Sequence, residues 1–545
     1  MHPGNHWGGS LEVSNGNADD DQDRQGMSED WDRASLYHQQ QQQQFNDIND
    51  PVHHHHHHNL NDTQKSCRKL LKWSVWTLVI AFMVIALPII LVNTLPKHKS
   101  RPPPPDNYTL ALHKALLFFN AQKCLEDGND TTLNKNGLVG GYYDAGDNAK
   151  FHFPMAYTMT MLSWSVIEYS HKYESIGEYK HVRELIKWGT DYLLLTFNSS
   201  STKISQIYCQ VGGGQNGSTT PDDHSCWQRP EDMDYERPTQ TCVSGPDLAG
   251  EMAAALAAAS IVFKDNAKYS KKLVQGAETL YSFARDSGKR RSYSRDNTFI
   301  SPYYNSTGYY DEYMWGAACW NNKLPAAMLL LTRLRIFLNP GYPAEDMLRM
   351  YHNTTCLNMC SYLRGSSPSI GLEHLVPKQW NDLIKQRGVQ PLQYAANSAF
   401  LANLFADYLT ASGGLYTRQK PYENELRGGF WHQIPRHVHH RGASIPNNKK
   451  FYSCKDGWKW FHSSKPNPNN ITGAMVGGPD RFDRFRDVRS SYNYTEPTLA
   501  GNAGLVAALV SLTTTAGDGI DKNTIFSEIP PPGPQNPPPP PPWKP

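Results

Sequence analysis

The sequence lacks a strong net charge, a zinc-binding cysteine pattern and an alternation of strands with helices. Its 545 residues contain 53 Lys and Arg against 51 Asp and Glu, a formal net charge of +2. Because no basic stripe is interleaved with aromatic residues, a nucleic-acid partner is not expected. The nine cysteines include no C-x-x-C pairs at zinc-finger spacing. The missing βαβ alternation argues against a parallel sheet.

Both ends of the chain have few residues that can build a core. Residues 1–72 include a Gln tract and a His tract, which predicts a disordered tail. Residues 96–106 are expected to form a stiff Pro-rich linker. Residues 516–545 are expected to form a Pro-rich tail, with a polyproline II extension from Pro530. The part expected to fold is therefore 107–515, which is long enough for a large core.

A segment without charged residues covers 73–92. About 20 apolar residues suffice to cross the roughly 30 Å hydrocarbon layer of a membrane. The segment starts too far from the N-terminus, and is too long, to be a signal peptide. A single transmembrane helix is therefore predicted at 73–95.

N-glycosylation sequons orient this segment, because only Asn61 precedes it. Residues 1–72 are expected to be cytosolic and 107–515 lumenal or extracellular, as in a type II protein of the plasma membrane or the Golgi and secretory route. That compartment favours disulfides, and Cys209 and Cys226, which flank a Gly-rich loop, are the predicted partners. The sequons after the segment are at Asn107, Asn129, Asn198, Asn216, Asn305, Asn353, Asn470 and Asn493.

The remaining periodic signal is helical. After Pro154, for example, Met155, Met159, Leu162 and Val166 recur at helical spacing. An all-α domain is predicted, with layered helical hairpins around one core and long loops gathered at one end. The predicted helices are 107–122, a helix from 154, 247–263, 325–338, 345–363, 391–409 and 496–512.

Two pairs of carboxylates carry the strongest chemical signal. Asp144 and Asp147 lie around a turn at Gly146, and Asp487 and Glu496 lie far downstream. Carboxylates held close together titrate apart, so one stays protonated as an acid while another is ionised as a base. Hydrolysis of a glycosidic bond requires this division.

Asp144, Asp147 and Glu496 also have simpler interpretations. The pattern from Asp144 is similar to the start of an EF-hand loop, but its twelfth position is Met155 and not Glu, so calcium is not expected. A surface turn remains open for the same residues. Glu496 equally suits the first turn of a helix, with Pro497 at its first position.

A cationic segment contains His437, His439 and His440 between Arg436 and Arg441. The two arginines would repel a metal ion, so hydrogen bonding to sugar hydroxyls is favoured over a metal site. An exposed loop is the alternative. Neither a metal nor a cofactor is expected.

Together these segments resemble glycoside hydrolase family 9. Residues 485–503 fit the acid-containing signature of that family, 435–441 the end of its histidine signature, and 140–147 its water-activating motif. The similarity covers nearly the whole chain and is specifically to the plant membrane-anchored endo-1,4-β-glucanases of the KORRIGAN type.

This resemblance implies an (α/α)6 barrel with an open cleft and inverting hydrolysis of cellulose or related β-1,4-glucans. It implies Asp147 as the base that activates water, Asp144 as a residue that holds the water, and Glu496 as the general acid. It also implies association with the cellulose-synthesising machinery. Further implied site residues are Asp487 and His439 for catalysis, and Tyr143, Arg441 and Tyr492 for substrate binding.

Several segments depart from the family. The chain is shortened near 123–128 and jumps at 319–320, and residues 365–389 and 413–433 do not match. These departures predict missing or replaced segments and an incomplete barrel. The alternative function is therefore a catalytically impaired glycan-binding paralogue, or a mis-spliced form of the same enzyme.

Overall fold

The structure, a computed structural model, divides into two units, Met1–Pro102 and Pro103–Pro545. No helix among the described residues is long and apolar enough to cross a membrane, and most of the span predicted at 73–95 lies outside them. The segments that depart from the family also lie almost entirely outside. The described residues are 73–77, 82–83, 107–123, 137–213, 222–235, 237–295, 297–306, 308–309, 324–337, 345–361, 390–411, 434–480 and 484–513.

Helices dominate the second unit. Six of the seven predicted helices lie within about two residues of an observed one, and only the last differs by more. The longer helices are α4 (Asn107–Gln122), α5 (His152–Ser175), α6 (Tyr179–Leu193), α7 (Pro246–Val262), α8 (Ala267–Arg285), α10 (Leu324–Phe337), α11 (Glu345–Ser361), α13 (Pro391–Ala411) and α18 (Leu499–Leu512). The short elements are α15 (Arg441–Ser444), α16 (Cys454–Phe461), α17 (Tyr492–Thr495), η2 (Pro230–Asp232) and η3 (Ser287–Lys289).

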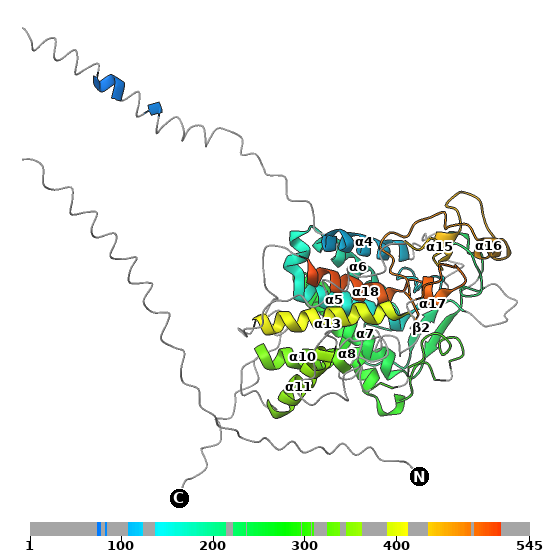
Figure 1. Ribbon diagram of the computed structural model, residues 1–545. Helices are drawn as coiled ribbons and strands as arrows, with labels where there is room; N and C mark the ends of the chain where they lie inside the picture. The colour runs from blue at the N-terminus through cyan, green and yellow to red at the C-terminus, as the bar shows by residue number, and fades with distance from the viewer. Residues whose placement is uncertain are drawn as a thin grey trace, which may run out of the picture. The chain divides into compact units, whose positions relative to one another are not determined.

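The central helices are apolar on nearly every side. α7 and α18 are rich in Ala, Gly and Leu, and almost all of their residues are buried. α5 is likewise buried along most of its length. Small side chains let helices approach closely. α5 therefore packs against both α7 and α18, and α18 also packs against α13 and α4 (Figure 1).

The outer helices are amphipathic. α6 buries Leu185 and Ile186, α8 buries Leu273 and Leu280, and both expose charged residues on the opposite face. α6 packs on α5, α8 packs on α7, and α10 packs on α11. Consecutive helices thus form hairpins, and the predicted helix-rich architecture is confirmed.

A small sheet, which the sequence did not predict, lies beside the helices. β1 (Lys150–Phe151), β2 (Ile207–Val211) and β3 (Thr239–Cys242) pair antiparallel in the order β1-β2-β3. Lys150 pairs with Val211 and Ile207 pairs with Cys242. Because β1 begins only three residues after Asp147, the sheet fixes the end of the Asp144–Asp147 turn.

α18 begins later than predicted. Its N-cap is Thr498, whose hydroxyl accepts a hydrogen bond from the Gly501 N–H at 3.1 Å. Glu496 instead follows α17 as its C-cap, with an extended backbone. The interpretation of Glu496 as a residue in the first turn of a helix is therefore wrong, because the Thr498 side chain starts the helix two residues later.

The predicted Cys209–Cys226 disulfide is also wrong. Cys209 pairs with Cys242, since the β2–β3 ladder brings these residues to a Cα separation of 6.0 Å. Cys226 pairs with Cys454 at the start of α16, at 4.9 Å. The second bond joins segments 228 residues apart and ties α16 to the 222–235 segment.

These pairings predict the outcome of non-reducing peptide mapping of the purified protein. Cys209 should be recovered linked to Cys242, and Cys226 linked to Cys454. The C454S variant should lose about 2–4 kcal/mol of unfolding free energy, because a long loop is no longer closed. A Cys209–Cys226 peptide in the map would contradict the assignment.

Candidate active site

The candidate site is built where three distant segments meet at Gly146. The Gly146 N–H donates to Glu496 Oε1 at 3.0 Å, and its carbonyl accepts from the Arg441 backbone N–H at 3.1 Å. A Cβ on Gly146 would lie 2.0 Å from the His439 carbonyl oxygen and 3.0 Å from Glu496 Oε1. Only glycine permits this approach, so the Asp144–Asp147 turn, residues 439–441 and Glu496 form one cluster. In Figure 1, α15, α16 and α17 lie together at one end of the helices.

Asp147 is buried and held by a histidine. His224 Nδ1 donates to its Oδ2 at 2.8 Å, and the Ala149 N–H donates to its Oδ1 at 3.1 Å. Burial acts to raise the pKa of Asp147, but the hydrogen bond and charge of His224, together with Arg441 and Ala149, outweigh it and lower the pKa. Asp147 is therefore ionised over a wide pH range.

In Glu496 the effects that raise the pKa outweigh those that lower it. Burial and the nearby Asp147 charge raise its pKa to about 7, although the Gly146 N–H, Arg441 and His224 act against the rise. Two carboxyls joined through one backbone turn thus differ in protonation. Near neutral pH Glu496 holds a proton in part of the molecules, whereas Asp147 is ionised.

Asp144 carries the third carboxyl of the cluster. Burial raises its pKa well above its usual value, and the charges of Asp147 and Glu496 act in the same direction, whereas a hydrogen bond donated by the Tyr304 hydroxyl to Oδ2 opposes them. Among the described residues no group hydrogen-bonds to the buried Asp144 Oδ1. Asp144 is therefore a neutral carboxyl with one unsatisfied oxygen atom, which suits a water molecule.

Arg441 holds the site together and does not face a substrate. It is 3% exposed. Its Nη1 donates to the Gly146 carbonyl at 2.7 Å, its Nε to the Cys226 carbonyl at 2.7 Å, and its Nη2 to the His224 carbonyl. The predicted substrate contact of Arg441 is replaced by a clamp on three backbone segments, for which the guanidinium fork is suited.

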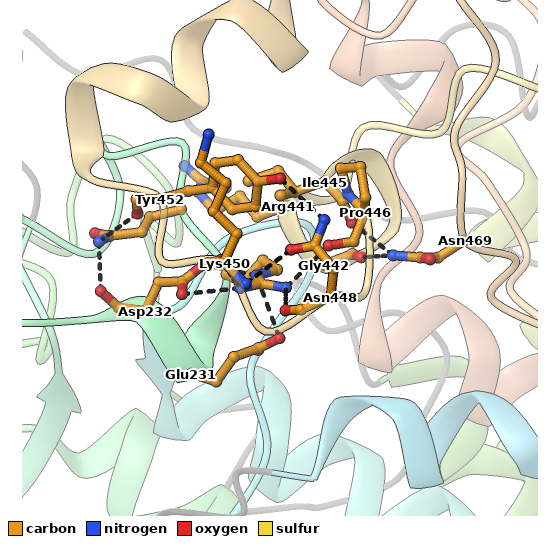
Figure 2. A network of polar contacts seen from close by, with 12 residues as sticks. Glu231, Asp232, Arg441, Gly442, Ile445, Pro446, Asn448, Lys450, Tyr452 and Asn469 are labelled. Carbon is orange, nitrogen blue, oxygen red and sulfur yellow. Dashed lines mark hydrogen bonds and ion pairs between the residues drawn. The ribbon is translucent and has the colours of Figure 1, made fainter.

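The loop after Arg441 is fixed by a second polar network (Figure 2). Asn469 Nδ2 donates to the carbonyls of Gly442 and Ile445 at 2.8 and 2.6 Å. Arg229, paired with Asp232, donates to the carbonyls of Pro446, Asn448 and Lys450. The loop is thereby anchored to the 222–235 segment, which carries His224.

His439 and Tyr492 form an aromatic pair beside Glu496. His439 Nδ1 donates to the Arg489 carbonyl at 2.7 Å, and burial and the Arg441 charge lower its pKa to about 4. Its Nε2 is therefore an acceptor at neutral pH. The Tyr492 ring is 53% exposed and its centroid lies 6.0 Å from that of His439. This arrangement suits a sugar ring that offers hydroxyls and an apolar face.

The His440 ring has a supporting role, because both of its nitrogens form hydrogen bonds within the protein. Its Nδ1 accepts from the Ala443 N–H at 3.2 Å, so its Nε2 donates to Gln122 Oε1 at 2.9 Å. Gln122 in turn donates to the Ala145 carbonyl at 2.7 Å. Burial and the Arg441 charge lower the pKa of His440 to about 3. The neutral ring supports the Asp144–Asp147 turn from the side of α4.

Two predicted site residues have other roles. Asp487 accepts the backbone N–H groups of Arg436 and His437, both at 2.9 Å, and so anchors the start of the histidine segment. Tyr143 is 6% exposed and packs with Met233, under the Arg237 guanidinium. Neither geometry favours the predicted direct role in catalysis or in substrate binding.

His224 and Tyr304 were not predicted from the sequence. His224 is 77 positions from Asp147 and belongs to no segment that was singled out as catalytic. Its ring centroid lies 4.4 Å from that of Tyr303, the neighbour of Tyr304. The Asp222-Asp223-His224 sequence beside Cys226 was the available signal, because polar residues clustered in a loop often serve a site.

Within the described ranges no group of three or more His, Cys, Asp or Glu side chains is arranged to hold a metal ion. The Asn493 sequon is half-buried, and Asn129 and Asn216 lie outside the described residues. The exposed sequons are Asn107, Asn198, Asn305, Asn353 and Asn470.

Comparison with known proteins gives a consistent family. The model of glycosyl hydrolase family 9 matches residues 108–319 and 318–509. Endoglucanase 12 of Oryza sativa subsp. japonica is 49% identical over 633 residues, covering 100% of both chains. That alignment is longer than the 545 residues of this chain, so it places gaps in this chain. The two family matches overlap at 318–319, next to the jump predicted at 319–320.

Solved structures agree on the fold. An endoglucanase from the termite Nasutitermes takasagoensis superposes with a TM-score of 0.59 at 30% identity, covering 75% of this chain and 98% of that chain. Endoglucanase CelQ from Clostridium thermocellum, solved in complex with cellotriose, superposes with a TM-score of 0.56 at 25% identity. That alignment covers 79% of this chain and 73% of CelQ.

The raised pKa of Glu496 predicts a pH-dependent gain in stability for E496Q. The carboxyl titrates at 4.5 when unfolded and at about 7 when folded. The folded state is therefore penalised as pH rises through 7, and this penalty is absent below 4.5. At pH 8 the variant should be more stable by on the order of 3 kcal/mol. Chemical denaturation at pH 8 and pH 4.5 measures this, and an equal gain at both values would contradict it.

Proposed function

The chain belongs to glycosyl hydrolase family 9, and from this membership we propose that it hydrolyses internal β-1,4-glucosidic bonds of cellulose or related glucans with inversion. A relative named endoglucanase aligns with the full length of the chain. A structural neighbour, CelQ, was solved in complex with cellotriose. The clustered carboxyls of Asp144, Asp147 and Glu496 supply the acid and base groups that this reaction needs.

The observation that carries the proposal is the opposite pKa shift of Asp147 and Glu496 across Gly146. Asp147 is the base: its ionised carboxylate takes a proton from water as that water attacks the anomeric carbon. Glu496 is the general acid: it gives its proton to the oxygen of the leaving sugar. Asp147 gains a proton and Glu496 loses one, so each turnover ends with Asp147 protonated and Glu496 ionised.

Asp144 and His439 assist this step. The neutral Asp144 offers its unsatisfied Oδ1 to the attacking water, while Tyr304 fixes the other oxygen. His439 presents Nε2 as an acceptor to a sugar hydroxyl. His224 is a positioning residue that keeps Asp147 ionised and oriented.

A catalytically weak, glycan-binding protein is the second candidate. It is supported by the two-part family match and by the gaps in the alignment with Endoglucanase 12. We propose that the (α/α)6 barrel of this chain lacks part of its wall, so that the acid and base are intact while the glucan is held less firmly. Misplacing reacting groups by about 1 Å costs on the order of a hundredfold in rate.

We further propose that the chain is a type II membrane protein with a helix at 73–95. The uncharged segment, the sequons that follow it and the two disulfides support a lumenal or extracellular domain in the secretory route or at the plasma membrane. We also propose association with the cellulose-synthesising machinery, because the resemblance to the KORRIGAN-type endoglucanases implies it. Protease protection of the domain in sealed microsomes would test the orientation.

Turnover should depend on both carboxyls and on pH. D147N and E496Q should each reduce the release of reducing ends from carboxymethylcellulose by at least about a hundredfold. For the parent, kcat/KM should fall as pH rises through about 7, because Glu496 loses its proton. On the acidic side it should hold down to about pH 4, where His439 takes up a proton and Nε2 no longer accepts from a sugar hydroxyl. Asp147 remains ionised there, because its pKa is lowered.

The matched control is D265N, since Asp265 is an exposed carboxylate whose partner is Arg183 on α6. This variant should keep the turnover of the parent. If E496Q retained activity at the level of D265N, the assignment of the general acid would be wrong.

Restoring the segment missing at 319–320 and the family sequence replaced at 413–433 should raise activity. The restored form is expected to exceed this chain by on the order of a hundredfold in kcat/KM. Reducing-sugar assays on both forms, each with its E496Q variant as background, provide the measurement. Equal turnover would mean that these segments are dispensable.

A further inference from the structure

A row of aromatic rings leads away from the site along α16. The Phe461 ring centroid lies 6.0 Å from that of His439, and the Trp458 centroid lies 4.9 Å from that of Phe461. Trp458 is also stacked on His462, with centroids 5.8 Å apart and an interplanar angle of 29°. On the other side of His439 lies Tyr492, at 6.0 Å. The row therefore passes from Tyr492 through the site to Trp458.

The two ends of the row are exposed and its middle is packed. Trp458 is 38% exposed and Tyr492 is 53% exposed, whereas Phe461 packs against the buried Trp227 with centroids 4.8 Å apart. A single exposed aromatic is ordinary on a protein surface. What distinguishes Trp458 is its continuity, through Phe461, with the residues that surround Glu496.

α16 is held rigidly, so the Trp458 ring is presented in one place. A Cβ on Gly457 would lie 1.4 Å from the Trp227 carbonyl oxygen, which means that α16 lies directly on that backbone. Ser453 and Asp456 form a capping box at its start. At its end, the buried Arg489 donates to the carbonyls of Trp460 and Ser463. The Cys226–Cys454 disulfide adds a covalent tie.

Such an aromatic ring matches the chemistry of a β-1,4-glucan. The hydroxyls of a β-linked glucose unit lie around the ring edge, so both ring faces carry only C–H groups and are apolar. A preorganised aromatic side chain covers such a face at little entropic cost. Lys459 does not compete for the exposed face of Trp458, because it lies over the rings of Tyr452 and Trp460.

We propose that Trp458, supported by His462 and Phe461, forms an additional subsite that binds a glucose unit of the β-1,4-glucan chain away from the bond being cleaved. This proposal rests on the proposed function and deepens it. The row of rings sets the direction of the chain, from Tyr492 past His439 and along α16. Trp458 is thus a residue that determines preference for long over short glucans.

The test uses the full chain carrying E496Q, which binds glucan without cleaving it, and measures the Kd for cellohexaose by titration calorimetry. W458A in this background should raise the Kd about tenfold, as expected for loss of an aromatic contact. W458Y should recover most of the affinity, which a merely structural role would not require. Y281A is the matched control, since Tyr281 is 43% exposed on α8, and it should leave the Kd unchanged.

Equal Kd values for W458A and its E496Q parent, or no cellohexaose binding by the parent, would overturn the proposal. Hydrolysis by the chain without E496Q is measured separately. If hydrolysis is absent while binding still depends on Trp458, the subsite stands and the proposed catalytic function fails.

Discussion

The site depends on one close approach, in which the backbone of Gly146 contacts both Glu496 and the His439 carbonyl. No side chain larger than hydrogen fits there. Arg441 stabilises this contact by donating hydrogen bonds to the carbonyls of Gly146, Cys226 and His224. A buried guanidinium is costly unless its donors are satisfied, and here the carbonyls satisfy them while Asp147 lies nearby. Segments far apart in sequence are thereby held as one unit.

This geometry determines which carboxyl is ionised. Asp144, Asp147 and Glu496 are close enough that all three cannot carry charge in a buried site. Of these three carboxyls, His224 donates only to that of Asp147, so Asp147 keeps the negative charge. The pKa values of Asp144 and Glu496 are raised, which favours their neutral forms. The acid and base roles are therefore set by which carboxyl has the histidine partner and not by residue type.

Local patterns and long-range contacts differed in how well they could be predicted. Helices such as α4 and α13 follow from apolar spacing and end signals, which are local. The start of α18 was missed because the Thr498 cap competes with the equally reasonable Glu496–Pro497 start. The disulfide partner of Cys226 could not be found, because Cys454 is 228 positions away and only the fold brings them together.

The same distinction applies to the site. Asp144, Asp147, Glu496 and His439 lie in segments with recognisable patterns, and the structure brings all four together. His224 and Tyr304 contact them only through tertiary packing. Asp487 and Arg441 are in the correct segments but bind backbone groups, and a sequence does not reveal the direction of a side chain.

The central claim is that Asp147 and Glu496 have opposite protonation behaviour across Gly146. Carbon NMR titration of the protein with labelled Asp and Glu carboxyls tests it most directly, with D147N and E496Q used to assign the two signals. The account predicts that Glu496 titrates at about 7 and Asp147 below its ordinary value of 3.8. Titration of Glu496 near 4.5, or of Asp147 above Glu496, would contradict it.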